Sequence, residues 1–334
     1  MTGPKTKQLP VLACTDVEHL KENPVKALAA RSYGPVEDLT LADVPKPTPG
    51  PGQVLVRTEA SALNAIDLAL ITGAVKDHLP IQHPFVPGVD VTGVVEVVGE
   101  GVSRFSVGDR VLAWNGVPSG GLAEYALVQD APSAALRPAT LGPAESAGLP
   151  TAALTAAALI DEATPRADEK VLVVGASGGV GSFAVQLAKQ TGAKVLATAR
   201  TDEEDLLRRL GADATVDYRT SDVTAEALRW APGGVDVVID LTHAGPALTG
   251  AAAAARPGGR LVSPLVGPPA FDRGVTAVYT GTRTPPGQLE ALAVQTAEGR
   301  LRVEIGARYS FTDAPQALAD YAHKHLHGKV VITF

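Results

Sequence analysis

Three glycines, Gly175, Gly178 and Gly181, follow the apolar run Val171–Val174 and precede a stretch with helical spacing of apolar residues. Glycines at this spacing allow a tight turn, close approach of a pyrophosphate to the backbone, and close packing of the helix on the sheet. The first turn of such a helix has unpaired N–H groups and the positive end of the helix dipole, so it attracts phosphate. The pattern predicts a dinucleotide site with contacts from Gly175, Ser177, Gly178, Gly179, Val180 and Gly181.

The end of the following strand indicates which nicotinamide cofactor binds. In a site for NAD, an acidic side chain at this point accepts hydrogen bonds from the ribose 2′-OH. Here the strand Val195–Thr198 is followed by Ala199 and Arg200, without a carboxylate. The planar guanidinium of arginine makes paired, charge-assisted hydrogen bonds that suit a 2′-phosphate. We therefore expect NADPH, with Thr198, Ala199 and Arg200 among its contacts; the alternative is a surface Arg200 that pairs with the acidic run 202–205.

Length and composition describe an ordinary globular protein. The chain has 334 residues, 45% of them hydrophobic and 19% charged, with a formal net charge of −7. This length predicts two domains with substantial cores. The acidic balance argues against a nucleic-acid partner, and the absence of basic runs and of long apolar stretches argues against a membrane partner.

Cys14 is the only cysteine in the sequence. A single cysteine excludes an internal disulfide and a zinc site built from several thiolates. The segment Val11–Cys14 resembles a lipoprotein cleavage site, but residues 5–10 before it form no apolar segment of the kind a signal peptide needs. We therefore expect no signal peptide and a cytoplasmic location.

The spacing of apolar residues divides the chain into three parts. Residues 1–24 are polar, are interrupted by prolines, and are expected to form an N-terminal arm. Residues 25–143 contain strand patterns separated by glycine and proline. From residue 144 onward, strands alternate with helical segments, which predicts an α/β fold with a doubly wound parallel sheet. The strands expected in that sheet are 171–174, 195–198, 214–217, 235–240 and 259–262, and the alanine run 251–255 is expected to be helical.

Several segments outside the glycine turn resemble one protein family. They are ASALNAID at 60–67, PFVPGVDVTGVV at 84–95, VGEGVSRFSVGDRV at 98–111 and GGLAEY at 120–125, together with the turn GASGGVG at 175–181 and GKVVIT at 328–333. With these segments the chain resembles the medium-chain dehydrogenase/reductase superfamily, specifically its zinc-independent quinone oxidoreductase (zeta-crystallin-like) branch. The resemblance extends from about residue 25 onward.

The resemblance implies a Rossmann-type doubly wound sheet inserted into an irregular, GroES-like β-barrel. The barrel would comprise residues 25–143 and 300–334 and bind the substrate, residues 144–299 would bind NADPH, and the active site would lie in the cleft between them. The resemblance also implies a homodimer that pairs through an edge strand at 274–280. Further cofactor contacts implied in this way are Asn64, Thr151, Tyr218 and Leu265, although Thr151 could instead cap the following helix.

The residue types in the expected cleft do not form a zinc site. Zinc-dependent members of the superfamily carry a cysteine where this chain has Asn64 and a histidine where it has Val89, and their cysteine-rich zinc lobe is absent here. A catalytic zinc needs about three protein ligands. The histidines outside this pattern, expected to be loop or surface residues rather than ligands, are His78, His83, His323, His325 and His327.

The expected reaction is hydride transfer from NADPH to an electron-poor acceptor, either a quinone or a conjugated enone. Asn64 is the candidate catalytic residue, because its amide can donate to a carbonyl oxygen that gains negative charge. The alternative is that Asn64 is a turn residue that holds its own loop. Two features of the family are missing: Asp67–Ile71 contains no tyrosine, and the acidic run 202–205 contains no lysine. His243 is either a general acid or a solvated residue at the rim of the cleft.

Three functions fit these features. The first is an NADPH-dependent quinone or enone reductase, and the second is an enoyl-thioester or polyketide-type enoyl reductase on the same scaffold. The third is a non-enzymatic NADPH-binding protein, although the net negative charge argues against one that binds RNA. Activity on thioesters but not on small quinones would favour the second function, and NADPH binding without turnover would favour the third.

Overall fold

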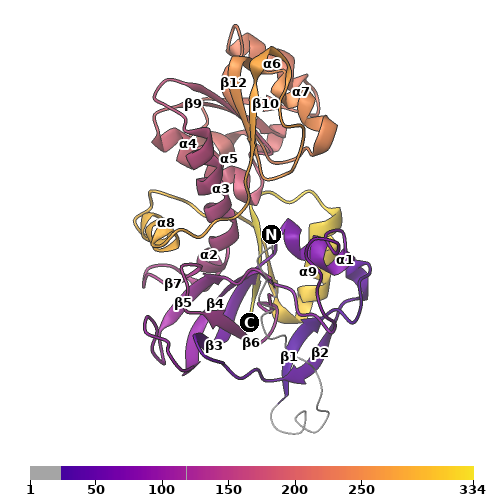
Figure 1. The fold of residues 1–334 in the computed structure, drawn as a ribbon, viewed down its shortest axis with the longest axis vertical. Helices are drawn as coiled ribbons and strands as arrows, with labels where there is room; N and C mark the ends of the chain where they lie inside the picture. The colour runs from indigo at the N-terminus through magenta and orange to yellow at the C-terminus, as the bar shows by residue number, and fades with distance from the viewer. Residues whose placement is uncertain (1–23, 118) are drawn as a thin grey trace, which may run out of the picture.

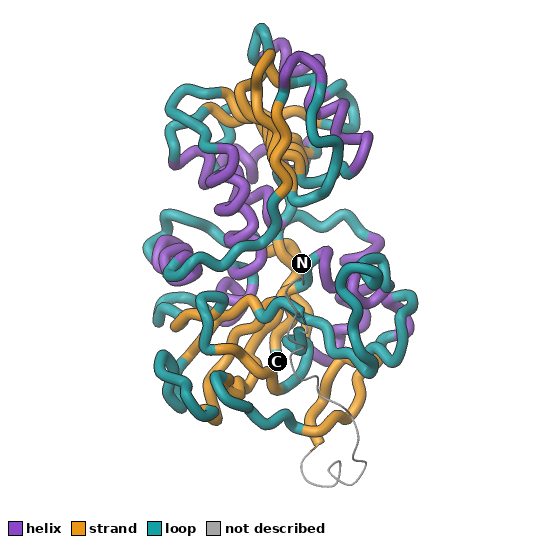
Figure 2. Tube along the Cα trace, viewed as in Figure 1, coloured by secondary structure: helices purple, strands orange, loops and turns teal. Residues whose placement is uncertain are grey.

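The computed structural model describes residues 24–117 and 119–334, so Cys14 and the predicted N-terminal arm, apart from Pro24, lie outside the described residues. The described chain forms two lobes, each built on a β-sheet (Figures 1 and 2). Helix α3 (Pro150–Ala163) runs between the lobes.

The upper lobe in Figure 1 contains a six-stranded parallel sheet in the order β10-β9-β8-β11-β12-β13. Its strands are β8 (Lys170–Val174), β9 (Lys194–Ala199), β10 (Ala214–Asp217), β11 (Val235–Asp240), β12 (Ala255–Ser263) and β13 (Thr276–Tyr279). A parallel sheet whose first strand is central and whose order reverses there is the Rossmann arrangement. The expected doubly wound sheet is confirmed, and β13 forms one of its edges.

Helices cover both faces of this sheet. They are α4 (Gly179–Gln190), α5 (Glu204–Arg209), α6 (Val223–Trp230) and α7 (Leu248–Ala252). Val171 and Val173 of β8 enter an apolar cluster with α3, α4 and α5, whereas Leu172 and Val174 enter another with α6 and α7. Alternate residues of a strand face opposite sides of a sheet, so the continuous apolar run in β8 results from burial on both sides.

The alanine run differs from its prediction. Helix α7 ends at Ala252, and Ala255 already begins β12, where it pairs in parallel with Val235 of β11. Both Ala255 and Val235 are fully buried. The expected helix over 251–255 is therefore wrong in its second half, because strand pairing in the core outweighs the helix propensity of alanine.

The lower lobe contains a seven-stranded sheet in the order β14-β15-β3-β4-β5-β7, with β6 paired to β3. Its strands are β3 (Gln53–Ala62), β4 (Asp90–Val98), β5 (Arg110–Trp114), β6 (Tyr125–Gln129), β7 (Ala134–Leu136), β14 (Ile305–Ser310) and β15 (Lys329–Thr333). Strand β15 lies antiparallel to β3 although it comes from the far end of the sequence. This sheet, the irregular barrel of the GroES-like fold, confirms the second half of the expected fold class.

The remaining elements lie in this lobe, at its junction with the other lobe, or between strands of the upper lobe. They are the ribbon β1 (Pro24–Ala29) and β2 (Thr40–Pro45), the helices α1 (Ala65–Thr72), α2 (Pro143–Ala147), α8 (Gln288–Ala297) and α9 (Ala314–His323), and short 3₁₀ turns at 36–38, 201–203, 245–247, 272–274 and 311–313. We propose that the lobes are domains, with residues 25–143 and 300–334 in the barrel and 144–299 in the Rossmann domain. None of the helices in the described ranges is long and apolar enough to cross a membrane.

Candidate active site

A cavity of about 1240 Å³ lies where the two lobes meet. One wall comes from the carboxyl ends of the parallel strands and includes the glycine turn 175–181 and Leu241–His243 after β11. The opposite wall comes from the barrel and includes Leu63–Ile66 at the start of α1 and Gly328–Lys329 at the start of β15. Ligands of open parallel sheets bind at the carboxyl ends of the strands, so this cavity is the candidate active site.

Most of the cofactor contacts predicted from the sequence line this cavity together. They are Asn64, Thr151, Gly175, Ser177, Gly178, Gly179, Val180, Gly181, Thr198, Tyr218 and Leu265. The two other predicted contacts, Ala199 and Arg200, are not among the lining residues. Ala199 is fully buried as the last residue of β9, and Arg200 follows it directly.

The glycine turn has the shape that a pyrophosphate requires. Gly175 has φ +81°, a left-handed conformation that glycine adopts without strain. A Cβ at Gly181 would collide with the carbonyl oxygen of Gly175, so glycine is needed for α4 to start this close to β8. A Cβ at Gly178 would meet no atom closer than 3.5 Å, which leaves room for a ligand at the start of α4. The turn therefore fits a dinucleotide phosphate at a helix N-terminus.

Arg200 follows the strand end where the adenosine ribose binds in this fold. Its Nε is buried, lacks a hydrogen-bond partner within the described residues, and lies 3.5 Å from Oδ1 of Asp202. The alternative, pairing of Arg200 with the acidic run, is thus limited to one 3.5 Å contact. The guanidinium therefore still has N–H donors for an anionic ligand. The buried carboxylate of Glu203 instead accepts the Arg200 backbone N–H at 2.9 Å and contacts the His325 ring at 2.6 Å, so both its oxygens are used.

Four buried side chains, those of Asn64, Asp90, Thr151 and Lys329, form a hydrogen-bonded network at the barrel wall of the cavity, here named the Asp90 network. Oδ1 of Asp90 accepts the backbone N–H and the hydroxyl of Thr151 at 2.9 and 2.6 Å. Oδ2 accepts Nδ2 of Asn64 at 2.9 Å and Nζ of Lys329 at 3.3 Å. Nζ of Lys329 also donates to Oδ1 of Asn64 at 2.6 Å and to the Leu63 carbonyl at 3.1 Å. The buried ammonium is thus paired with a buried carboxylate, as low polarity requires.

The Asp90 network changes the role expected for Asn64. Its Nδ2 donates to Asp90 and also to the carbonyl oxygen of Ala62, at 3.1 Å, so both amide hydrogens are used within the protein. Donation by this amide to a substrate carbonyl does not fit this geometry, whereas the alternative of a residue that holds its own loop does. The alternative that Thr151 caps the following helix does not fit either. Its hydroxyl donates to Asp90, and α3 has no side-chain cap.

Asp67 holds together the backbone segments next to the Asp90 network. Its fully buried carboxylate accepts the backbone N–H groups of Asn64, Gly88 and Val89 at 2.9, 2.9 and 3.1 Å. Burial raises the pKa of Asp67 to about 6, and the nearby charge of Asp90 adds to this effect, while the hydrogen bonds oppose it. Asp67 therefore fixes the start of α1 to the loop that leads into β4.

The barrel side of the cavity is mainly apolar. Its apolar side chains include Ile66, Val75, Trp114, Val117 and Leu326. Lys329 is the one Lys or Arg side chain among the lining residues of the described chain, and it is buried in the Asp90 network. Tyr321 of α9 adds a hydroxyl, and Thr155 and Thr282 bond each other at 2.7 Å. This wall suits an uncharged, largely apolar molecule.

The histidines do not gather into a metal site. No group of three or more His, Cys, Asp or Glu side chains within the described ranges could hold a metal ion. His323 contacts Glu37 at 2.5 Å, and His325, which lines the cavity, contacts Glu203. His243 also lines the cavity, about half exposed, with Nδ1 2.8 Å from Oδ2 of Asp240. That pairing holds the ring at the rim near the end of β11.

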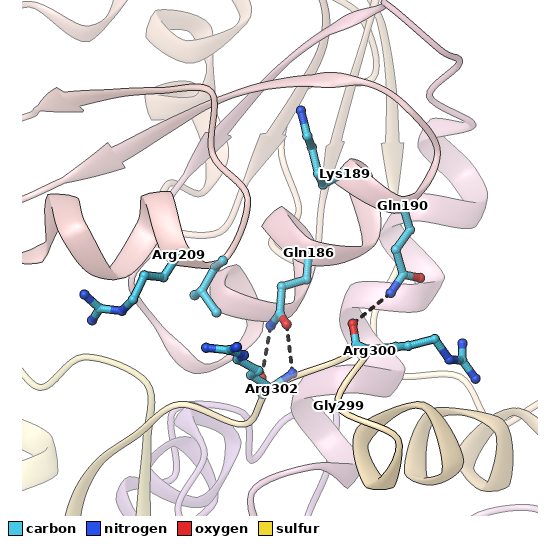
Figure 3. Close-up of a pocket in the computed structure, with 8 residues that line it drawn as sticks. Gln186, Lys189, Gln190, Arg209, Gly299, Arg300 and Arg302 are labelled. Carbon is cyan, nitrogen blue, oxygen red and sulfur yellow. Dashed lines mark hydrogen bonds between the residues drawn. The ribbon is translucent and has the colours of Figure 1, made fainter.

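A second, smaller pocket of about 330 Å³ lies beside the C-terminal half of α4 (Figure 3). The Gln186 side chain bonds both the backbone N–H and the carbonyl oxygen of Arg302, at 2.8 and 3.0 Å, and Gln190 bonds the Arg300 carbonyl at 3.2 Å (Figure 3). These bonds anchor the segment 299–302 to α4. The pocket is a basic surface at a structural junction and shares no residue with the larger cavity.

Comparisons with known proteins agree with this arrangement. Residues 210–332 match a family described as zinc-binding dehydrogenase, and residues 50–137 match the alcohol dehydrogenase GroES-like domain. The quinone-oxidoreductase QR1, chloroplastic, of Triphysaria versicolor is 34% identical over 322 residues, which cover 90% of this chain and 95% of the relative. The chain belongs to the quinone oxidoreductase branch of the medium-chain dehydrogenase/reductase superfamily. As a member of this branch it is an oxidoreductase that binds a nicotinamide cofactor.

Other members of the superfamily extend the comparison. The 2-methylene-furan-3-one reductase of Solanum lycopersicum is 34% identical over 331 residues, covering 92% of this chain and 79% of the relative. The quinone oxidoreductase structure from Coxiella burnetii has a TM-score of 0.83 at 28% identity, covering 93% of this chain and 100% of that one. A mycobacterial protein solved in complex with NADPH has a TM-score of 0.81 at 27% identity, with the same coverage.

Several residues of the cavity and of the Asp90 network were not assigned a role from the sequence. Lys329 was part of the GKVVIT segment and Asp90 part of the PFVPGVDVTGVV segment, but no spacing links them, because they meet only through the fold. Tyr321 lies in an amphipathic helix, where a tyrosine is most simply explained by packing. His325 was grouped with its neighbours and not with Glu203, which is distant in sequence.

Proposed function

We propose that this protein is an NADPH-dependent, zinc-independent reductase whose acceptor is a quinone or a conjugated enone. The observation that carries the proposal is a cavity with the glycine turn on one wall and a mainly apolar barrel wall opposite. When bound, NADPH supplies a hydride to an electron-poor acceptor. The chain's own residues bind and orient the two reactants.

The cofactor side of the proposal assigns roles to the residues of the turn and strand ends. The start of α4 binds the pyrophosphate through the backbone N–H groups of Gly179 and Val180, and Gly178 leaves room for it. Arg200, whose Nε lacks a hydrogen bond and lies 3.5 Å from Asp202, would turn its guanidinium to the 2′-phosphate, with Tyr218 on the cavity wall. Asn64 and Thr151 line the cavity and are held by the Asp90 network, and they would contact the nicotinamide end of the cofactor. The Asn64 role is therefore proposed as positioning through its fixed side chain.

The proposal of zinc independence rests on the side chains at positions 64 and 89, where zinc-dependent relatives carry zinc ligands. Asn64 and Val89 stand where zinc-dependent relatives have a cysteine and a histidine, and neither an amide held in a network nor an aliphatic side chain is a zinc ligand. The matched family is described as zinc-binding dehydrogenase, but that match covers residues 210–332 and includes neither Asn64 nor Val89. We accordingly propose that the acceptor carbonyl is activated by hydrogen bonding.

The charge of the cavity lining supports the proposed acceptor class. A phosphorylated carrier such as an enoyl-CoA needs basic side chains along its path, but the cavity lining in the described chain has no arginine and one buried lysine. An uncharged quinone or enone needs only apolar contact and a hydrogen-bond donor for its oxygen. The names of the Triphysaria and tomato relatives, a quinone oxidoreductase and an enone reductase, support the same two classes.

Assembly and location are also proposed. An exposed sheet edge can pair with a second copy. The edge strand β13 exposes Val278, and the preceding loop exposes Val266, which favours a homodimer paired through β13. A cytoplasmic location stays a prediction, since the name of the Triphysaria relative includes chloroplastic.

The test is a turnover assay that follows NADPH consumption with small quinones, conjugated enones, enoyl thioesters and, in reverse, ethanol with NADP⁺. Quinones and enones should be reduced, ethanol should not be oxidised, and thioester turnover alone would overturn the acceptor class. A Gly178→Asp variant places a carboxylate in the open space of the turn, so NADPH binding should be lost while the fold remains. Gly178→Ala is the matched control, because its Cβ also fits but carries no charge. Tight NADPH binding by Gly178→Asp would refute the cofactor site.

A further inference from the structure

The donors that surround Asn64 are already engaged. Both amide hydrogens of Asn64, the Thr151 hydroxyl and the Lys329 ammonium donate to acceptors within the protein. An acceptor oxygen that took one of these hydrogens would leave a buried oxygen of Asp90 or a backbone carbonyl without its partner. Such a loss costs about 1–3 kcal/mol, and more for a charged group. The donor for the acceptor oxygen is therefore expected elsewhere on the cavity wall.

Tyr321 is placed to be that donor. It lies on α9 near its C-terminal end, lines the cavity, and packs on the apolar barrel cluster that includes Leu70 and Ile71 of α1. Its hydroxyl makes no hydrogen bond to any other residue of the described chain, unlike the hydroxyl of Tyr309, which donates to Asp320 from the neighbouring strand. Helix α1 itself has no tyrosine in 67–71. A phenol that lines the active-site cavity and lacks a protein partner is available to a ligand.

The surroundings keep this phenol protonated. Burial raises the pKa of Tyr321, and the negative charges of Asp67 and Asp90 raise it further. A phenol in this state is a permanent hydrogen-bond donor and a poor proton source. It can stabilise charge that develops on an oxygen without giving up its proton.

The other hydrogen-bonding groups that line the cavity fit this role less well. His325 is engaged with Glu203 and His243 with Asp240. Thr155 and Thr282 bond each other. Ser177 lies in the glycine turn, whose groups face the phosphates in the proposed binding mode. Tyr321 carries the cavity hydroxyl that shares the barrel wall with Asn64 and makes no hydrogen bond to another described residue.

We propose that the Tyr321 hydroxyl donates a hydrogen bond to the acceptor's carbonyl oxygen and so stabilises the negative charge that this oxygen gains during reduction. The inference rests on the proposed function. The hydride carries two electrons and one hydrogen to the acceptor, its oxygen becomes an oxyanion, and the proton that completes the product comes from water. Tyr321 keeps its own proton throughout and is a catalytic residue through contact with the reacting molecule.

A Tyr321→Phe variant tests the inference because it removes the hydroxyl and keeps the ring that packs on the barrel. With a small quinone, kcat should fall by about a hundredfold, in the range seen when one such donor is removed. The Kd for NADPH, measured by fluorescence, and the melting temperature should remain as in the unmodified protein. The matched control is Tyr125→Phe, which removes a hydroxyl that donates to Glu96 on the barrel strands and does not line the cavity. Its kcat should not change.

A binding measurement separates this inference from the proposed function. In the presence of NADP⁺, the infrared carbonyl stretch of a ¹³C-labelled quinone should lie at lower frequency in the unmodified protein than in Tyr321→Phe. Failure of the unmodified protein to reduce any quinone or enone would overturn the proposed function. Normal turnover in the unmodified protein, with an equal kcat or an equal carbonyl frequency in Tyr321→Phe, would overturn the role of Tyr321 alone. A fall in kcat matched by lower melting temperature or weaker NADPH binding would also overturn it, since the hydroxyl would then be structural.

Discussion

Replacement of Lys329 by methionine is the sharpest test of the Asp90 network. Methionine keeps most of the apolar part of the lysine side chain, which lies against Gly179 of the glycine turn, and removes the ammonium. The ammonium makes three hydrogen bonds, to Leu63, Asn64 and Asp90, at 2.6–3.3 Å. Removal of one partner from a buried ion pair costs about 3–5 kcal/mol, because the other charge remains buried. Asp90 keeps three further donors, so we expect a loss of about 3 kcal/mol in the free energy of unfolding.

The network also predicts that a second substitution restores part of this loss. Asp90→Asn alone should destabilise, since the new amide faces Nδ2 of Asn64, which Lys329 holds in place by donating to Oδ1. In the double variant Lys329→Met with Asp90→Asn, the Asn64 amide is free to turn and the two amides can pair. The double variant should therefore lose less stability than the sum of the single variants, by about 2 kcal/mol, a coupling typical of residues in one network.

Urea denaturation of the four proteins, followed by intrinsic fluorescence, measures this coupling. Lys324→Met is the matched control, because Lys324 is mostly exposed and its partner Asp320, 2.8 Å away, keeps the Tyr309 and Gln316 donors. Its loss should stay below about 1 kcal/mol. Additive single effects, or a Lys329→Met loss no larger than that of Lys324→Met, would refute the idea that charge pairing in the network supports this wall.

Four further outcomes follow. Arg200→Ala should weaken NADPH binding about tenfold to a hundredfold and NADH binding little, because charge-assisted bonds to the 2′-phosphate are lost. Arg209→Ala, at an exposed position, should leave both Kd values unchanged. Equal weakening of NADPH and NADH binding would disprove the assignment. Prolonged chelator treatment should leave quinone reduction intact, and recovery of lost activity by zinc would contradict metal independence. Val278→Asp at the β13 edge should shift the mass in light scattering from dimer to monomer; a monomeric unmodified protein would end this proposal. Asp67 has a pKa of about 6 in the folded protein against 3.8 for the free side chain, so the folded state binds this proton more tightly. The stability of the unmodified protein relative to Asp67→Asn should therefore fall as pH rises from 3.8 to about 6 and stay level above, and the opposite slope would reject the assignment.

The parts of the structure that local spacing controls were predictable. The glycine turn and the β-branched runs before and after it encode their strands and helix within a few residues of one another. The prediction of eleven cavity residues follows from that local pattern together with the resemblance. The end of the alanine run was not predictable, because pairing of Ala255 with Val235 decides it.

The chemistry around Asn64 was less accessible from the sequence. An asparagine at the start of a helix shows neither which partners its amide has nor whether it is free. Asn64, Asp90, Thr151 and Lys329 come from four segments separated along the whole chain, and only the packed fold shows that they bond. The prediction that Asn64 donates to the substrate used its donor type alone. It could not include the bonds of both amide hydrogens to Ala62 and Asp90.

The contact between β15 and the glycine turn has a consequence for how the protein is made. The Gly328 N–H donates to the carbonyl oxygen of Ser177 at 2.7 Å, and Lys329 then enters the wall beside Asn64. The Rossmann strands are translated before this segment and can pair among themselves as they leave the ribosome. The cavity itself lacks one wall until residues 328 and 329 have emerged. A nascent chain stalled before that point would carry the glycine turn without residues 328 and 329, so the cavity is completed only near the end of synthesis.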